Sequence, residues 1–178
     1  MPYRITSRKV MGLKDLRGKT AFITGGALGM GRSLAGMLLE EGCRVALVDI
    51  REAELEDARA ELAGRSEVRA YRCDISDREQ VYSLARRVRE ELGTVDILVN
   101  NAGVVKSNPF LEKPDEVIER TVAVNLLAHF WTMKAFLPGM VEKKEGHVVN
   151  MASAGGLLGV PYISDYCATK FAVIGLTE

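Results

Sequence analysis

The chain has 178 residues, of which 47% are hydrophobic, and its 24 basic residues balance 24 acidic ones. This composition suffices for one domain with a substantial core and excludes an unfolded chain, and the zero net charge gives no reason to expect a nucleic-acid partner. Three widely spaced cysteines and two histidines argue against a disulfide framework or a metal site. We therefore expect a cytoplasmic protein that holds no metal.

Residues 1–15 form a basic leader without a continuous apolar run, so we expect neither a signal peptide nor a transmembrane span. A mobile, solvated leader is the favoured interpretation, and weak contact with an anionic membrane surface is the alternative. No linker or repeat divides the remainder, which predicts a single domain over residues 16–178.

Short β-branched segments alternate with longer amphipathic ones along this domain, a pattern typical of β-α-β units and a parallel sheet. Strands are expected at 20–24, 44–49, 68–74, 96–100 and 147–151. Helices are expected at 30–41 and 52–62, then from a Ser76–Glu79 capping box, from about 114 until Pro138-Gly139 ends or bends the helix, and from about 163 onward.

The segment after the first expected strand is glycine-rich and reads Thr24-Gly25-Gly26-Ala27-Leu28-Gly29-Met30-Gly31. Glycines allow a tight turn, so that a pyrophosphate can lie at the N-terminus of the next helix, where N–H groups and the helix dipole favour an anion. The spacing predicts a dinucleotide site, and a tight turn without a ligand is the alternative. The expected cofactor contacts are Gly25, Leu28, Gly29, Met30 and Gly31.

Asp49 ends the second expected strand, 18 residues after Gly31. A carboxylate at this place accepts hydrogen bonds from the adenosine ribose hydroxyls and repels a 2'-phosphate, which favours NAD over NADP. Arg51 supplies the alternative, because a guanidinium neutralises such a phosphate. Asp49 can also cap the helix that follows.

Tyr166 and Lys170 stand four residues apart in the last expected helix, so their side chains share one helix face. A free phenol ionises near pH ~10, and a phenolate that acts at neutral pH requires a pKa of roughly 7 to 8. The ammonium of a lysine about 4 Å away provides an interaction of the required size. The pair indicates a tyrosine general base, and a half-buried tyrosine covered by a lysine stem is the alternative.

Together these motifs resemble the main branch of the short-chain dehydrogenase/reductase family. Its cofactor turn, Thr-Gly-x-x-x-Gly-x-Gly, is matched at 24–31, and its Asn-Asn-Ala-Gly motif is matched at 100–103. The family's active site is matched by Asn125, Ser153, Tyr166 and Lys170, with Ser153 standing 13 residues before Tyr166 as is usual in the family. The resemblance covers about residues 13–178 and implies a Rossmann-type, doubly wound α/β fold with strand order 3-2-1-4-5.

The resemblance implies a role for each matched residue. Tyr166 removes the proton of a bound alcohol as hydride passes to NAD, and Ser153 holds the substrate oxygen. Lys170 binds the nicotinamide ribose and lowers the Tyr166 pKa, while Asn125 holds a water that links Lys170 to solvent. Asn125 can instead bond to a neighbouring strand, and Ser153 can be an ordinary turn residue. The remaining implied cofactor contacts are Asp74, Ile75, Asn101, Ala102 and Gly103.

The segments around Asn125 and Ser153 look like the retinol and hydroxysteroid dehydrogenase branch, which implies a hydrophobic alcohol or ketone substrate. Leu157, Leu158 and Val160 are candidates for an apolar pocket or for core. Family members continue for about 70 more residues, so we expect a domain incomplete at its C-terminus, without the last strands and the lid, and with little activity of its own. The resemblance also implies a homodimer or homotetramer formed through the two long helices.

Three functions are open at this point. An NAD-dependent alcohol dehydrogenase or ketone reductase is the leading prediction. An NADPH-dependent ketoreductase is the second, and a dinucleotide-binding scaffold without catalysis is the third. The presence of Ser153, Tyr166 and Lys170 disfavours the scaffold.

Overall fold

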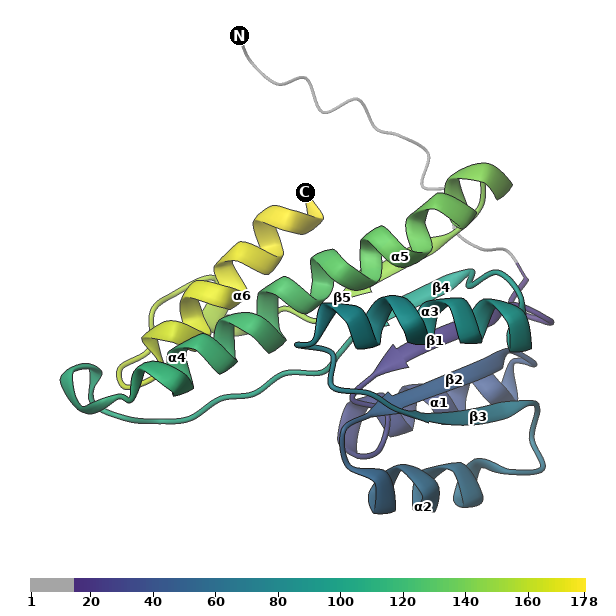
Figure 1. The fold of residues 1–178 in the computed structure, drawn as a ribbon, viewed down its shortest axis with the longest axis horizontal. Helices are drawn as coiled ribbons and strands as arrows, with labels where there is room; N and C mark the ends of the chain where they lie inside the picture. Colours follow the sequence, from purple (N-terminus) through teal and green to yellow (C-terminus); the bar gives the residue numbers. More distant parts are fainter. Residues whose placement is uncertain (1–14) are drawn as a thin grey trace, which may run out of the picture.

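A computed structural model describes residues 15–178 and shows a five-stranded parallel sheet with helices on both faces (Figure 1). The predicted basic leader, 1–15, lies almost wholly outside the described residues. The strands are β1 (Thr20–Thr24), β2 (Arg44–Asp49), β3 (Val68–Arg72), β4 (Ile97–Asn100) and β5 (His147–Asn150). They pair in parallel in the order β3-β2-β1-β4-β5. The predicted Rossmann-type fold and strand order are confirmed.

Six α-helices connect or follow the strands: α1 (Gly29–Glu40), α2 (Glu52–Leu62), α3 (Arg78–Leu92), α4 (Asp115–Val122), α5 (Ala128–Lys143) and α6 (Ser164–Thr177). A π-helical segment, η2 (Ala123–Leu127), joins α4 to α5 in one long helical arm. Two short 3-10 helices, η1 (Phe110–Glu112) and η3 (Ala154–Gly156), precede α4 and α6. Within residues 15–178, no helix is both long and apolar enough to cross a bilayer.

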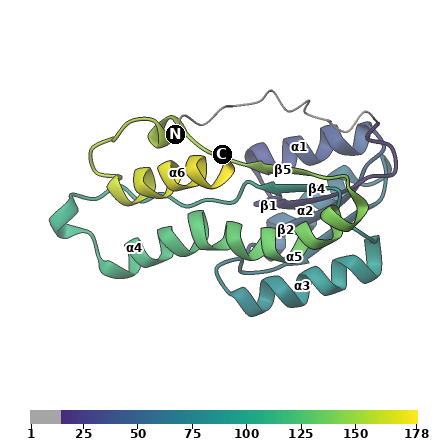
Figure 2. The ribbon, with the colours of Figure 1, turned by 90° about the horizontal axis from the view of Figure 1, so that it is seen from above.

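The sheet separates two apolar cores because neighbouring residues of a strand point to opposite faces. Ala21 and Ile23 of β1 pack with residues of α1 and α2, whereas Phe22 between them packs with residues of α3 and α5. Figure 2 shows α1 on one side of the sheet and α3 and α5 on the other. The central strands are apolar on both faces, as expected for a parallel sheet covered by helices.

Two local predictions are wrong, and a third is narrowed. The N-cap of α3 is Asp77, whose carboxylate accepts hydrogen bonds from the backbone N–H groups of Glu79 and Gln80. Ser76 is not the cap, because its hydroxyl donates to Asp74 instead. The third strand ends at Arg72 rather than at residue 74. Of the two outcomes expected at Pro138-Gly139, the helix does not end there, since α5 continues to Lys143.

The strands direct their carboxyl ends toward the part of the molecule where α4 and α6 extend beyond the sheet (Figure 1). The glycine turn follows β1, Asp49 ends β2, Asp74 follows β3, and Asn101 follows β4. In an open α/β sheet this edge is where ligands bind. The fold therefore brings the predicted site residues to one edge.

Candidate active site

The glycine turn between β1 and α1 has no room for larger residues at two positions. A Cβ on Gly31 would lie 2.2 Å from the carbonyl oxygen of Gly25, and a Cβ on Gly25 would lie 2.8 Å from Nδ2 of Asn101. Gly25 also has a φ of +66°, in the left-handed region that favours glycine. The close approach explains why the turn needs glycine at both ends.

The N-terminus of α1 is open to an anion. Among the described residues, no side chain caps α1, and its first turn contains no acidic residue. The first N–H groups of a helix without such a cap attract an anion, and the helix dipole adds to that attraction. Leu28 and Met30 at this end are exposed. The turn therefore suits a pyrophosphate, as predicted from its spacing.

Thr24 and Asn101 join the ends of β1 and β4. The hydroxyl of Thr24 accepts hydrogen bonds from the backbone N–H groups of Asn101 and Ala102, both at 3.0 Å. Nδ2 of Asn101 donates to the carbonyl oxygens of Thr24 at 2.9 Å and Gly25 at 3.2 Å. The Asn101 side chain therefore holds the glycine turn. The next two residues, Ala102 and Gly103, line the cavity described below.

A cavity of about 120 Å³ lies beside the turn, at the ends of β2, β3 and β4. It gathers six of the predicted cofactor residues: Gly25, Asp49, Asp74, Ile75, Ala102 and Gly103. The other predicted turn residues, Leu28, Gly29, Met30 and Gly31, do not line it. Val48, Ile50, Cys73, Val104, Arg120 and Val124 line it as well and were missed. The first four directly adjoin predicted residues at strand ends, so chain adjacency was a usable signal for them.

Asp49 is buried at this cavity and holds two groups. Its carboxylate accepts hydrogen bonds from the backbone N–H of Ala27 at 3.3 Å and from Nε and a terminal nitrogen of Arg51 at 3.1 and 3.2 Å. Burial raises the pKa of Asp49, but the hydrogen bonds from Arg51 and from the backbone outweigh it and hold that pKa below its usual value. A charged carboxylate therefore faces the cavity, with Arg51 bound to it.

Asp74, on the cavity wall, is paired with Arg120 of α4. A terminal nitrogen of Arg120 donates to the two carboxylate oxygens at 3.1 and 2.9 Å and to the hydroxyl of Ser76 at 2.5 Å. Burial raises the pKa of Asp74, and the hydrogen bonds from Arg120 and Ser76 lower it by more. Arg120 stands 46 residues from Asp74, so no local signal in the sequence could have paired them.

The loop after β5, which carries Ser153, packs against α6 through two glycines. Ser153 accepts a hydrogen bond from the backbone N–H of Gly155 at 3.2 Å. A Cβ on Gly155 would lie 3.4 Å from the Tyr166 ring, and one on Gly156 would lie 2.7 Å from the carbonyl oxygen of Lys170. The two glycines thus let the loop pack directly against α6. This role was not predicted, although Gly155 and Gly156 stand next to each other in the sequence.

Lys170 is buried one helical turn after Tyr166. Its Nζ lies 5.7 Å from the centroid of the Tyr166 ring and donates a hydrogen bond to the carbonyl oxygen of Met151 at 2.5 Å. A Cβ on Gly103 would lie 3.8 Å from this Nζ, which places Lys170 beside the cofactor cavity. Burial lowers the pKa of Lys170. The two members of the predicted pair therefore meet on one face of α6.

Asn125 in η2 uses its amide on the backbone of Val104. Its Oδ1 accepts from the Val104 N–H and its Nδ2 donates to the Val104 carbonyl, both at 2.8 Å. Nδ2 also lies 3.4 Å from the hydroxyl of Thr169 in α6. Asn125 thus joins the loop after β4 to α6. The alternative expected a bond to a strand, whereas Val104 lies in a loop, and the predicted role of Asn125 in holding a water stays a prediction.

Within the described part of the chain, no group of three or more His, Cys, Asp or Glu residues is close enough to hold a metal ion.

A parallel sheet in this order, with a glycine turn at the N-terminus of a helix and an acid at the end of β2, defines the class of dinucleotide-binding Rossmann proteins. Within that class, the chain belongs to the short chain dehydrogenase family, whose model matches residues 19–178.

Relatives and solved structures agree with this assignment. The chain is 45% identical to short-chain dehydrogenase/reductase family 16C member 6 of Bos taurus over 99% of this chain and 55% of that protein. It is 44% identical to epidermal retinol dehydrogenase 2 of Homo sapiens over 93% of this chain and 54% of that protein. It thus spans about half the length of these relatives. A short chain dehydrogenase/reductase of Burkholderia phymatum in complex with NAD superposes with a TM-score of 0.89 and 35% identity, covering 93% of this chain and 59% of that one.

Proposed function

We propose that the protein is an NAD-dependent oxidoreductase acting on a hydrophobic secondary alcohol or the matching ketone, with Tyr166 as general acid and base. The observation that carries the proposal is that Tyr166 and Lys170 share one face of α6, that the loop carrying Ser153 packs against this helix, and that Gly103 near Lys170 lines the Asp49 cavity. A scaffold that only binds a dinucleotide has no use for this arrangement.

The chain's own residues fit NAD. The turn from Gly25 to Gly31 tolerates no side chain at either end, and the N-terminus of α1 has no side-chain cap among residues 15–178. The buried carboxylate of Asp49 lines the adjacent cavity, where it can accept hydrogen bonds from ribose hydroxyls. When bound, NAD supplies the nicotinamide ring that accepts or donates the hydride.

The proton chemistry belongs to α6 and the loop after β5. In oxidation, the phenolate oxygen of Tyr166 takes the proton of the substrate hydroxyl, and in reduction the phenol returns it to the carbonyl oxygen. Ser153 donates a hydrogen bond to that oxygen and holds it within reach of Tyr166. Lys170, on the same face of α6, would hydrogen-bond the nicotinamide ribose.

Apolar residues near Ser153 support a hydrophobic substrate. Leu157, Leu158 and Val160 follow η3 and are exposed, so they are free to contact an apolar ligand rather than forming core. One of the relatives is named a retinol dehydrogenase, which agrees with this class of substrate.

The test is turnover of a panel of apolar alcohols with NAD⁺, followed by the absorbance of NADH. We expect Tyr166→Phe to lower kcat at least 100-fold, because general acid-base catalysis contributes about 10² to 10⁴, and to leave the dissociation constant of NADH within threefold. Tyr162→Phe is the matched control, because it removes an exposed phenol hydroxyl from the loop just before α6. Full activity of Tyr166→Phe would refute the proposed base, and failure to bind NADH would refute the cofactor.

Arg51 favours a second candidate, an NADPH-dependent ketoreductase. Its guanidinium is held at Asp49 and can neutralise a 2'-phosphate if the carboxylate turns away. We expect Asp49→Ser to shift the ratio of kcat/KM for NADH over NADPH toward NADPH by at least tenfold, and Arg51→Gln to shift it toward NADH. A wild-type preference for NADPH that Arg51→Gln abolishes would establish the second candidate instead.

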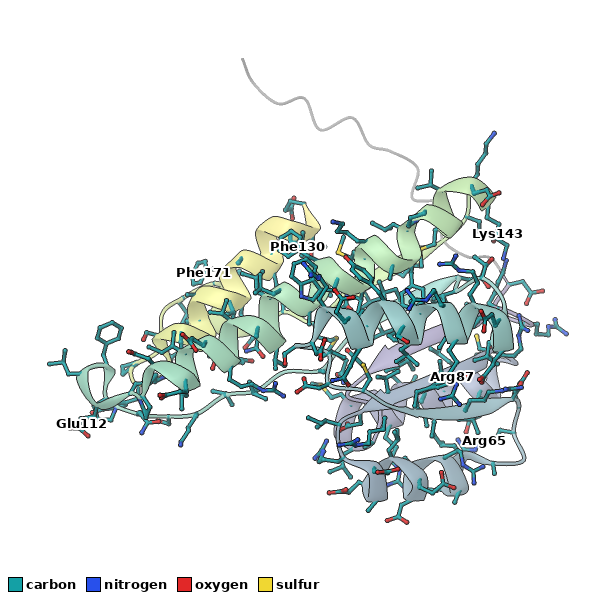
Figure 3. All side chains as sticks on the ribbon, viewed as in Figure 1. Arg65, Arg87, Glu112, Phe130, Lys143 and Phe171 are labelled. Carbon is teal, nitrogen blue, oxygen red and sulfur yellow. The ribbon has the colours of Figure 1, made fainter. Side chains whose placement is uncertain are left out.

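Self-association through α5 and α6 is a further part of the proposal. Phe130 of α5 and Phe171 of α6 are 40% and 48% exposed, and both are labelled on these neighbouring helices in Figure 3. Exposed aromatic residues of this kind mark protein interfaces. Light scattering should show a dimer or tetramer that Phe130→Glu dissociates, whereas a monomeric wild type would contradict the proposal.

A further inference from the structure

An ion pair outside the catalytic residues is among the most buried charged groups in the described chain. Lys113, directly after η1, binds the carboxylate of Asp165 in the first turn of α6, and their side chains are 1% and 4% exposed. Burial raises the pKa of Asp165, but the hydrogen bonds from Lys113, Thr121 and the backbone of Tyr166, with the charge of Lys113, together outweigh it and hold that pKa below its usual value. The two charges stand 52 residues apart in sequence.

Lys113 connects three segments rather than two. Besides Asp165, its ammonium donates to the carbonyl oxygens of Lys106 and Tyr162, both at 3.2 Å. Lys106 lies in the loop after β4, and Tyr162 lies in the loop that leads into α6. The three donors of one ammonium thereby hold both loops to the start of the helix that carries Tyr166.

One further contact and one backbone conformation show that this junction is tightly specified. The backbone N–H of Asn108 donates to the carbonyl oxygen of Tyr162 at 3.0 Å, which joins the same two loops again. Tyr162 has a φ of +68°, in the left-handed region that non-glycine residues rarely adopt. Such a conformation persists only where surrounding contacts determine it, and here two donors hold its carbonyl.

The loop after β4 is thus fixed to α6 at both of its ends. At residue 104, Asn125 binds the backbone of Val104 and reaches Thr169 of α6. At the other end, Lys113 binds Asp165. Tyr166 stands between Asp165 and Thr169 in sequence, so the two attachments flank the proposed base along α6.

We propose that Lys113 and Asp165 are positioning residues that hold Tyr166 and the two flanking loops in the geometry required for proton transfer. The inference rests on the proposed function, because it takes Tyr166 as the base. A buried ion pair can often be replaced by apolar residues with little loss of stability, so stability alone is a weak reason for this one. Misplacement of a catalytic group by about 1 Å costs roughly 100-fold in rate.

The test compares Lys113→Met with a matched variant at the other end of the same helical arm. Lys143 pairs with the buried Asp96, and Figure 3 shows Lys143 far from Glu112, the residue before Lys113. For both variants we would measure kcat, KM for the alcohol, the dissociation constant of NADH, the unfolding temperature, and amide hydrogen exchange over 104–109 and 160–166.

We expect Lys113→Met to lower kcat at least tenfold, to speed amide exchange in both loops together, and to leave NADH affinity within threefold. NADH affinity persists because Asp49 and Asp74 stand on other elements. Lys143→Met should lower the unfolding temperature without these changes, and Lys113→Arg should restore much of kcat. If Lys113→Met fails to fold, the double variant Lys113→Met/Asp165→Asn replaces it, since it leaves no unpaired buried carboxylate.

Unchanged exchange in the two loops, or a kcat equal to that of the wild type, would overturn the inference and leave the pair with a structural role alone. If the wild type neither binds NADH nor turns over an alcohol with NAD⁺, the proposed function fails instead. Amide exchange then still decides whether Lys113 holds the two loops to α6.

Discussion

His129 offers a prediction about stability that does not depend on catalysis. This residue lies on the buried side of α5 and is 2% exposed. Neither nitrogen of its ring has a hydrogen-bond partner within residues 15–178. Burial, assisted by the nearby charge of Lys170, lowers the pKa of His129 to about 4. The imidazole is therefore neutral in the folded protein at every pH at which the fold is normally studied.

The size and sign of the effect follow from the two pKa values. In the unfolded chain the pKa of histidine is about 6.5, so between pH 6.5 and 4 the unfolded state binds a proton that the folded state does not. The free energy of unfolding is fully present above this window and falls as the pH falls through it. The loss amounts to about 3 kcal/mol over the whole window, or about 2 kcal/mol between pH 7 and pH 5, at about 1.4 kcal/mol per pH unit.

Urea unfolding at pH 7 and pH 5 measures this contribution when the wild type is compared with His129→Leu. Leucine fills a similar volume and removes two unpartnered nitrogens, so we expect the stability at pH 7 to change by less than about 1 kcal/mol. The variant should then lose about 2 kcal/mol less than the wild type on acidification. His147→Leu controls for the loss of an exposed imidazole. The reasoning is refuted if His129→Leu and the wild type lose equal stability.

Three further substitutions, two of them with control variants, test the site and the packing around it. Gly156→Ala should lower the free energy of unfolding by about 1 to 3 kcal/mol, because its Cβ would lie 2.7 Å from the carbonyl oxygen of Lys170. Gly159→Ala is the control and should change the stability little, because a Cβ there would have no atom within 4 Å. Equal urea midpoints for the two variants would contradict this. Gly31→Ala should weaken NADH binding at least tenfold in a fluorescence titration, since its Cβ clashes with the turn, and an unchanged affinity would remove the turn from the site. Arg120→Gln should weaken NADH binding by about threefold to tenfold, about the net strength of one ordinary hydrogen bond. Arg78→Gln on an exposed pair should have no effect.

The strands, the helices and the cofactor turn were predictable because their signals are local. The alternation of apolar segments set the order of elements, and the glycines from Gly25 to Gly31 stand in one short segment. Parallel strands bring their carboxyl ends to one edge, so Asp49 and Asp74 could be placed at a common site without knowledge of any contact. The errors arose where two local solutions compete, as for Ser76 and Asp77 at the start of α3.

The sequence by itself determined the fold class and the glycine turn, because each depends on residues close together in the chain or on a repeated pattern, and its resemblance to a family implied the proposed catalytic residues. Only the tertiary structure decided that Arg120 pairs with Asp74, that Asn125 binds Val104, and that Lys113 reaches Asp165. These partners are 21 to 52 residues apart. Their pairing depends on how helices and loops pack at the carboxyl edge of the sheet, and no spacing in the sequence encodes that geometry.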